Sequence, residues 1–149
     1  MSTIIRRATP ADVPSIYQLI VELAEYEKAL HEVKNTPEQL LKDGFGEQPL
    51  YGTIVAEVNG EVVGMSLYYY RYSTWKGKRL YLEDLIIKEA YRGYGLGKRL
   101  LEATVEEARQ TQCSGLMWQV LDWNEPSIEF YKKFGAKLDG EWINCHVDL

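Results

Sequence analysis

The stretch AYRGYGLGKR, Ala90–Arg99, carries the clearest fold signal in this chain. It follows an apolar run and precedes a segment with helical periodicity, so it indicates the order strand, glycine-rich loop, helix. Glycines let the backbone bend and approach a ligand, while free amides and the helix dipole point at an anion. The loop therefore predicts a diphosphate site. The alternative is a glycine-rich turn flanked by solvated basic residues.

Two familiar phosphate motifs do not fit the spacing of this loop. The P-loop pattern G-x-x-x-x-G-K-[ST] fails because Arg92 stands at its first glycine and Arg99 follows Gly97-Lys98. The dinucleotide pattern G-x-G-x-x-G fails because Lys98 stands where the third glycine is needed. The pattern that matches is R-x-x-G-x-G, formed by Arg92, Gly93, Tyr94, Gly95, Leu96 and Gly97.

Composition limits the class of protein. The chain has 149 residues, which is one domain's worth, with 46% hydrophobic and 26% charged residues. Its 17 basic and 22 acidic residues give a net charge of −5, which argues against a broad nucleic-acid surface. Two cysteines suggest neither a disulfide framework nor a zinc cluster, and no run reaches membrane-spanning length. We expect a cytoplasmic protein without nucleic-acid or membrane partners.

The first half of the chain predicts two helices followed by an antiparallel meander. Thr9-Pro10-Ala11-Asp12 is typical of a helix start, and Thr36-Pro37-Glu38-Gln39 repeats it, with Gly44 as a stop. The runs YGTIVAEV and EVVGMSLYYYRY flank Asn59-Gly60, a strong two-residue hairpin signal. RLYLEDLIIK then predicts a further strand.

The second half alternates between helices and strands. The loop leads into LGKRLLEATVEEARQ, a helix, and LMWQVL predicts a strand. Asn124 can cap a helix over EPSIEFYKKF, and Gly135 can end it. A last pair of short strands is expected in AKLDGEWINCHVDL. The pattern predicts one α/β domain over residues 1–149, an α+β arrangement with a mixed sheet.

The R-x-x-G-x-G stretch and the element order resemble the GCN5-related N-acetyltransferases (GNAT). The segments LAEYE, DGFGE, YLEDL, YRGYGLG and WNEPSIEFYKKFGA are similar to the diamine (spermidine/spermine) and thialysine acetyltransferase branch. The resemblance implies the acyl-CoA N-acyltransferase fold, acetyl-CoA as co-substrate, no metal, a small amine substrate and a homodimer. The branch usually has a longer tail, so we expect any tail contact to be altered here.

The resemblance also implies where acetyl-CoA binds. The glycine loop would hold the pyrophosphate, and the strand end before it would pair with the pantetheine arm. The helix begun by Asn124 would supply further contacts, with Asn124 also the helix cap. The residues implied are Leu85, Ile86, Ile87, Arg92, Gly93, Tyr94, Gly95, Leu96, Gly97, Lys98, Asn124, Ser127 and Tyr131.

Acetyl transfer to an amine first requires loss of a proton. An alkyl ammonium has a pKa of about 10.4, so populating the neutral amine at pH 7 costs about 4.6 kcal/mol. Carboxylates that attract the cation and accept its proton meet this need. The resemblance assigns Glu83 as the base, acting directly or through water, and Asp84 as a substrate contact. Because they are adjacent on a predicted strand, we expect them on opposite faces. The alternative is a pair of carboxylates that lie at a sheet edge or form salt bridges with basic residues.

A second proton must reach the departing thiolate. The resemblance assigns this to Tyr131, since a phenol with a pKa of about 10 can donate as negative charge builds. The alternative is a core aromatic, because Ile128, Tyr131 and Phe134 share helical spacing.

The amine end is the least determined part of the sequence. Tyr26, Glu27 and Trp75 match positions that line the polyamine site of the diamine branch, although EYEKALHE is also typical of a solvated helix end. A polyamine or diamine is the first prediction. The rivals are thialysine or another lysine-like amino acid, whose carboxylate Arg71, Lys76 or Arg79 would bind, and a coenzyme A-binding module without turnover.

Overall fold

The structure is a computed structural model that describes residues 2–149. These residues form two compact units, one ending at Gln119 and the other spanning Val120–Leu149. Each is described by itself. One acetyltransferase domain over 1–149 stays a prediction.

The first unit is built on a mixed sheet whose strand order follows the chain, from β1 to β5. The neighbours from β1 to β4 pair antiparallel, whereas β5 pairs parallel with β4. The strands are β1 (Thr3–Arg7), β2 (Gly52–Val58), β3 (Glu61–Ser73), β4 (Gly77–Ile87) and β5 (Leu116–Trp118). The meander is confirmed. Strand β1 is an addition that the sequence did not predict, because TIIRR lacks a regular alternation.

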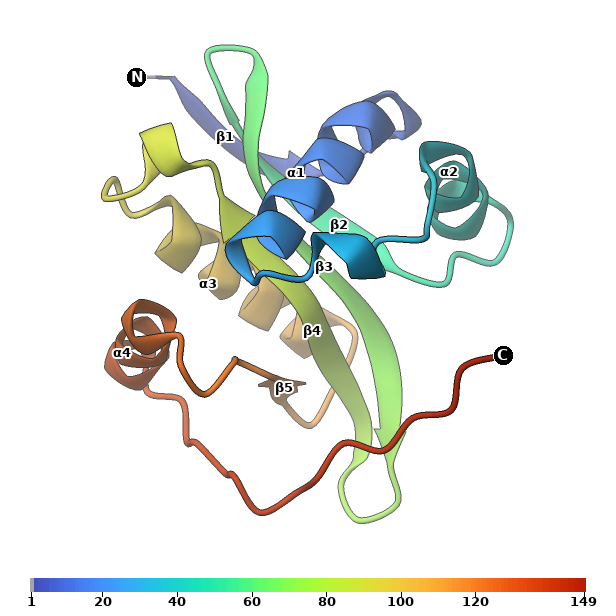
Figure 1. Cartoon of the computed structure of the whole chain (residues 1–149), viewed down its shortest axis with the longest axis vertical. Helices are drawn as coiled ribbons and strands as arrows, with labels where there is room; N and C mark the ends of the chain where they lie inside the picture. The colour runs from blue at the N-terminus through green and yellow to red at the C-terminus, as the bar shows by residue number, and fades with distance from the viewer. Residues whose placement is uncertain (1) are drawn as a thin grey trace. The chain divides into compact units, whose positions relative to one another are not determined.

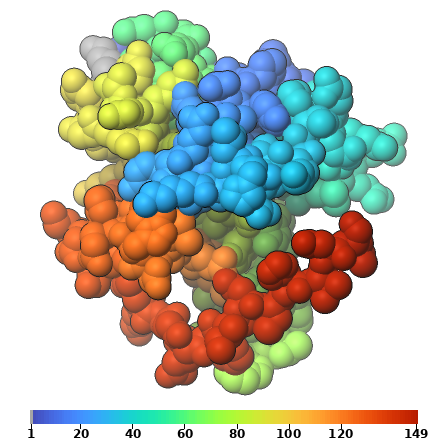
Figure 2. Space-filling model, viewed as in Figure 1, coloured from blue at the N-terminus to red at the C-terminus, as the bar shows by residue number. Residues whose placement is uncertain are grey.

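Helices cover both faces of this sheet (Figure 1). Helices α1 (Val13–Tyr26) and α2 (Pro37–Phe45) lie side by side, and α1 packs on β3 and β4. Helix α3 (Leu96–Gln110) packs on the other face. In Figure 2 the blue and cyan N-terminal helices close over the sheet from one side. The sheet thus has an α1 face and an α3 face.

Each face has its own apolar core. The α1 face is filled by Ile16, Leu19, Val55, Val62, Met65, Leu67 and Ile86. The α3 face is filled by Ile54, Ala56, Val58, Val63, Tyr68, Leu80, Leu96, Leu100 and Ala108. Burial at about 25 cal/mol per Å² of apolar surface is the main favourable term that holds the layers together. The strand residues in each core also show toward which face of the sheet their side chains point.

Local signals in the sequence are confirmed where hydrogen bonding is short-range. The Thr36 hydroxyl accepts from the Gln39 backbone N–H at 3.1 Å and caps α2. Asn59 and Gly60 have φ angles of 49° and 85°, as the tight β2–β3 turn requires. At these positions the residues adjacent in the sequence determine the backbone conformation.

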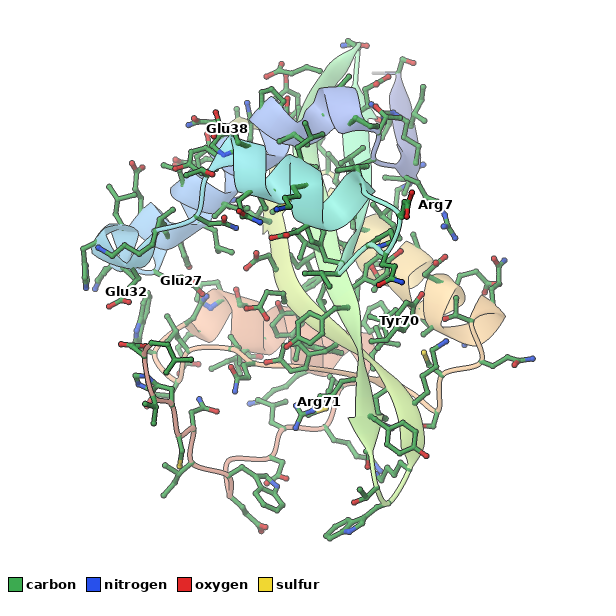
Figure 3. The ribbon with its side chains drawn as sticks, turned by 90° about the vertical axis from the view of Figure 1, so that its right-hand side faces the viewer. Arg7, Glu27, Glu32, Glu38, Tyr70 and Arg71 are labelled. Atoms are coloured by element: carbon green, nitrogen blue, oxygen red, sulfur yellow. The ribbon has the colours of Figure 1, made fainter. Side chains whose placement is uncertain are left out.

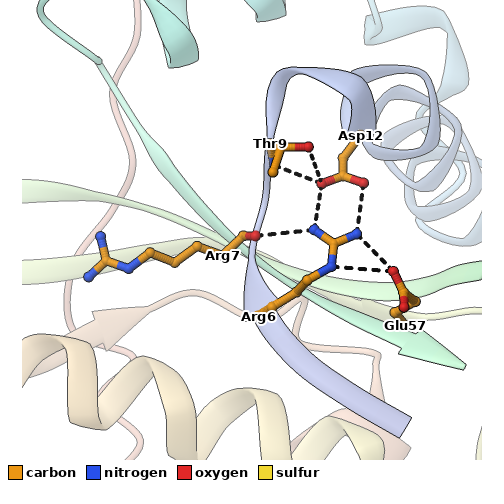
Figure 4. Close-up of polar contacts among 5 residues, drawn as sticks. All are labelled: Arg6, Arg7, Thr9, Asp12 and Glu57. Atoms are coloured by element: carbon orange, nitrogen blue, oxygen red, sulfur yellow. Dashed lines mark hydrogen bonds and ion pairs between the residues drawn. The ribbon is translucent and has the colours of Figure 1, made fainter. Parts of the chain in front are cut away.

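An arginine joins β1, β2 and the start of α1 (Figure 4). Arg6 donates to Asp12 Oδ2 at 2.8 Å and to Glu57 Oε1 at 3.0 Å. The Thr9 backbone N–H also donates to Asp12 Oδ2, at 2.7 Å, which closes the predicted capping box. The hydrogen bond from Arg6 holds the pKa of Asp12 below its usual value. We call Arg6, Asp12 and Glu57 the arginine junction.

The second unit contains α4 (Glu125–Phe134). The Asn124 side chain accepts from the Ser127 backbone N–H at 3.4 Å, and Gly135 ends the helix with φ of 100°. Both predicted caps are confirmed. The two terminal strands are not present, since the structure assigns no strand to residues 136–149. Trp142 and Ile143 stay exposed there, and an isolated pair of short strands that buries little surface is marginal in water.

Candidate active site

A β-bulge in β4 shapes the polar region of the first unit. Asp84 lies opposite Leu67 and Leu82 lies opposite Tyr68, so Glu83 is an extra residue with no partner of its own in β3. Leu67 belongs to the α1 face and Tyr68 to the α3 face. The bulge therefore changes the alternation and turns Asp84 toward α1.

Glu83 and Asp84 consequently share one face of the sheet. Alternation from Leu82, on the α3 face, places Glu83 on the α1 face, and the bulge places Asp84 there as well. The prediction of opposite faces is wrong, because it assumed an unbroken strand. Bulges commonly re-aim side chains next to active sites.

A third carboxylate, Glu27, joins them from the residue after α1. Burial and the neighbouring charges of Glu83 and Glu27 raise the pKa of Asp84 to about 7. Burial and the charge of Glu83 raise the pKa of Glu27. The surrounding protein raises the pKa of Glu83 too, although its side chain reaches solvent. We call Glu27, Glu83 and Asp84 the carboxylate cluster.

Two tyrosine rings adjoin the cluster on the α1 face. Tyr69 lies opposite Tyr81, and their ring centroids are 5.2 Å apart. Burial and the charge of Glu83 raise the pKa of both phenols. Neither tyrosine was predicted from the sequence to belong to the site. Tyr81 is the first residue of YLEDL, two residues before Glu83, and that spacing on a strand is the signal that could have found it. Tyr69 joins it only through the register of β3 against β4.

Beyond Leu82, β4 is no longer paired with β5, which ends at Trp118. The pairing of β4 with β5 covers Leu80 to Leu82 and stops just before Glu83. The Ile87 carbonyl accepts from Arg92 Nε at 3.0 Å, whereas the next residue, Lys88, donates its N–H to Val63 of β3 at 2.8 Å. Since peptide groups alternate in direction along a strand, those of Leu85 point to the same side as Ile87. The Ile86 side chain is buried in the α1-face core.

The glycine loop lies directly after this strand end. Gly93 and Gly95 have φ angles of 87° and 79°, a left-handed conformation that favours glycine. Gly95 caps the 15-residue helix α3, whose first-turn amides, on Leu96, Gly97 and Lys98, have no acceptor within the helix. Tyr94 is exposed, whereas the Leu96 side chain is buried in the α3-face core. Leu96 can therefore offer a ligand its backbone but not its side chain.

Arg92 connects the loop to α1. Its guanidinium lies over the Tyr26 ring, 5.6 Å from the centroid, while its Nε binds the Ile87 carbonyl. The structure thus brings together Arg92 and Tyr26, residues predicted for opposite ends of the site.

Trp75 does not join this group within one chain. It lies in the turn between β3 and β4 and is 85% exposed. Gly77, where β4 begins, is six residues from Glu83, which is about 20 Å at about 3.3 Å per residue.

The remaining predicted residues belong to the second unit. Asn124 is buried, Ser127 lies in the first turn of α4, and Tyr131 is buried on the same helix. Spacing on α4 places Tyr131 one turn after Ser127.

Among residues 2–149 no helix is both long and apolar enough to cross a membrane. In the same part of the chain no group of three or more His, Cys, Asp or Glu side chains is arranged to hold a metal ion.

Comparison with known proteins bears on the whole chain. Residues 14–136 match the model of the Acetyltransferase (GNAT) family. The chain is 46% identical to a thialysine N-epsilon-acetyltransferase of Bos taurus, over 95% of this chain and 89% of that protein. It is 41% identical to the spermidine/spermine N(1)-acetyltransferase-like protein 1 of Homo sapiens, over 89% of this chain and 20% of that protein.

The fold comparison agrees. An aminoglycoside acetyltransferase from an uncultured soil metagenomic sample, solved in complex with trehalose, superposes with a TM-score of 0.81. The match covers 99% of this chain and 96% of that chain at 20% identity. The mixed α/β prediction is confirmed. The chain belongs to the GNAT acetyltransferase family and is an acetyl-CoA-dependent N-acetyltransferase.

Proposed function

We propose that the enzyme transfers the acetyl group of acetyl-CoA directly to a terminal primary amine of a small aliphatic molecule. The observation that carries this proposal is the carboxylate cluster, in which three acidic side chains share the α1 face beside the glycine-loop strand. Each has a raised pKa, so each gains from a cation brought to it. An alkylammonium group is such a cation.

The residues between Leu85 and Lys98 fit acetyl-CoA. Positive-φ glycines and the free amides at the start of α3 suit a diphosphate. The peptide groups of Leu85 and Ile87, on the edge of β4 beyond its pairing with β5, suit the amide groups of pantetheine. In this proposal Leu85 also offers its N–H to the oxyanion that develops on the thioester carbonyl. Ile86 contributes by packing, since its side chain is buried.

Glu83 and Asp84 divide the work at the amine. Glu83 reaches solvent, so it accepts the ammonium proton directly or through a water molecule and passes it on. Asp84, partly buried with a pKa of about 7, holds the cation by its charge and titrates near neutral pH. Glu27 closes the cluster from the end of α1, and Tyr26, held by Arg92, forms an aromatic wall.

Tyr131 is the proposed acid that protonates the departing thiolate. Asn124 and Ser127, at the start of the same helix, are proposed cofactor contacts. Because the free thiolate is a good leaving group, one phenol proton completes the transfer without a covalent acetyl-enzyme.

A second copy of the chain is part of the proposal. Trp75 lies in the turn before Gly77, which is itself about 20 Å along β4 from Glu83, so its proposed role in substrate binding requires the hairpin of another copy. A homodimer would supply that hairpin. We also propose a cytosolic location, which two free cysteines support.

Two amine classes compete for the site. A polyamine or diamine is favoured by the carboxylate cluster and by the names of the spermidine/spermine-type relatives. A lysine-like amino acid is favoured by the relatives named for thialysine and by a basic side chain on the α1 face, considered below.

The test is release of free thiol from acetyl-CoA with spermidine, spermine, putrescine, thialysine, lysine and a lysine-containing peptide. We expect turnover of at least one small amine and little with the peptide. Tyr131→Phe should lower kcat by about 100-fold, the scale of one general acid, with acetyl-CoA affinity nearly unchanged.

Tyr17→Phe, on α1 and outside the proposed site, is the matched control and should keep wild-type kcat. If the peptide is the best substrate, the small-amine proposal is wrong. Equal kcat for Tyr131→Phe and wild type would remove the proposed acid.

A further inference from the structure

Arg71 is a basic side chain next to the proposed amine site that the mechanism above does not use. It lies on β3 two residues after Tyr69, so it shares the α1 face. Its guanidinium carbon is 5.6 Å from the centroid of the Tyr81 ring. Figure 3 shows Glu27 and Arg71 on the α1 side of the two strands and Tyr70 on the other side. The paired rings of Tyr69 and Tyr81 thus lie between Arg71 and the carboxylate cluster.

The charges of Glu83 and Arg71 both act on these rings. Glu83 raises the pKa of Tyr69 and of Tyr81, and Arg71 lowers it. The ring pair therefore has an anion at one end and a cation at the other.

Arg71 differs from the other basic residues of this hairpin. Lys78 donates to the Thr111 carbonyl at 3.0 Å and lies over Tyr70, on the opposite face. Arg79 donates to the Leu116 carbonyl at 3.3 Å, and Lys76 lies in the turn. Arg71 is exposed, and within residues 2–149 its guanidinium has no hydrogen bond or ion pair. Its donors remain available to a ligand.

The separation between the Arg71 guanidinium and the carboxylate cluster suits one class of amine. Arg71 lies opposite Arg79, four residues before Glu83, but its guanidinium carbon reaches to 5.6 Å from the centroid of the Tyr81 ring. Tyr81 is two residues before Glu83, about 7 Å along the strand. An extended lysine-like side chain of five bonds, at about 1.5 Å each, places its amine about 6 Å from the α-carbon. A carboxylate on that α-carbon would meet Arg71, while the amine enters the carboxylate cluster. A polyamine of similar length would bring a second ammonium to Arg71 instead, which is repulsive.

We propose that Arg71 is the specificity-determining residue of the amine site, where it binds a carboxylate of the substrate and so favours lysine-like amino acids over polyamines. The proposal rests on the proposed function, because it assumes that the amine enters the carboxylate cluster. Guanidinium suits this role because its planar fork pairs with a carboxylate through two hydrogen bonds.

The experiment compares two substrates that differ only in the carboxylate. Thialysine and its decarboxylated counterpart, bis(2-aminoethyl) sulfide, are assayed by thiol release with wild type, Arg71→Gln and Lys78→Gln. Arg71→Gln should raise KM for thialysine by about 10- to 100-fold, the range of a charge-assisted hydrogen bond, with kcat nearly unchanged. Its KM for the decarboxylated amine should stay the same or fall. Arg71→Lys should recover part of the thialysine affinity.

The control removes the same charge from the other face of the hairpin. Lys78→Gln should leave the preference between the two amines as in wild type. If Arg71→Gln changes KM for both amines equally, or for neither, the role of Arg71 is wrong. If wild type releases thiol with neither amine, the proposed function fails. Calorimetric titration of thialysine then tests the role of Arg71 by itself. Equal affinities of wild type and Arg71→Gln for thialysine would overturn that role, and weaker binding by the variant would support it.

Discussion

Two groups of acidic side chains in the first unit have opposite electrostatics. In the arginine junction, Asp12 and Glu57 surround one guanidinium, at 2.8 and 3.0 Å. In the carboxylate cluster, Glu27, Glu83 and Asp84 act on one another, and within residues 2–149 none of the three forms an ion pair with a lysine or arginine. The pKa of Asp12 is lowered, whereas that of Asp84 is raised to about 7.

The difference separates a group that stabilises the fold from the group to which we assign amine binding. The junction contains its own cation, so its charges stabilise the fold. The cluster lacks one, so gathering its charges costs folding free energy that an ammonium from outside would recover. The three predictions that follow test this contrast.

The largest effect is expected for Glu83→Gln. The amide keeps the size of the side chain but cannot accept the ammonium proton, so kcat should fall by about 100- to 1,000-fold. Steady-state thiol release with the best amine measures it. Raising the pH should restore part of the rate, because more amine is then neutral.

Glu38→Gln removes the same charge from α2 and should keep wild-type kcat. In Figure 3 Glu38 lies on α2 and Glu27 at the end of α1. A Glu83→Gln variant with normal kcat at pH 7 would show that the cluster binds the amine without taking its proton.

The sequence predicts the glycine loop, our proposed site for the anionic diphosphate, better than the carboxylate cluster, our proposed site for the ammonium group. A loop that binds phosphate with backbone amides needs glycines at fixed spacing, and Gly93 and Gly95 have the left-handed φ angles that the proposed diphosphate site would use. Caps and turns, such as Thr36 and Asn59-Gly60, are equally local and were predicted correctly.

The carboxylate cluster depends on contacts between strands, which residues adjacent in the sequence do not determine. The bulge at Glu83 arises from the register of β4 against β3, and nothing in YLEDL itself announces an extra residue. The ring pair of Tyr69 and Tyr81 depends on the same register. The family resemblance predicts Glu83 as the base, but only the structure puts it on the same face as Asp84.

An intermediate effect is expected when Asp84 or Asp12 is replaced by asparagine. The free energy of unfolding should change in opposite directions at the two positions. Asp84 binds a proton more tightly in the folded chain, so stability falls as the pH rises from about 4 through about 7. Asp84→Asn should therefore raise the free energy of unfolding at pH 8, by at most about 4 kcal/mol at 1.36 kcal/mol per pKa unit. The gain should vanish near pH 4.

Asp12 is the matched case. Its folded pKa is lowered, so its contribution is full above its usual pKa and is lost as the pH falls through the lower folded value. Asp12→Asn should lower the free energy of unfolding at pH 8 by about 1–3 kcal/mol, because it loses a charged hydrogen bond to Arg6. Urea denaturation at pH 4 and pH 8 measures both variants. Destabilisation by Asp84→Asn at pH 8 would place Asp84 among the structural groups.

The smallest effect is expected for Glu27→Gln, and it separates binding from proton transfer within the cluster. Glu27 enters from the end of α1, so it should attract the ammonium without accepting its proton. KM for the amine should rise about 3- to 10-fold, the value of one partly solvated charge contact, while kcat stays near wild type. Because the charge of Glu27 raises the pKa of Asp84, the variant should also shift the acid limb of the pH profile of kcat/KM to lower pH. Glu25→Gln, exposed on the same helix, should change neither quantity. If the acid limb does not move although KM rises, Glu27 contacts the amine without acting on Asp84, and the cluster is two separate sites rather than one.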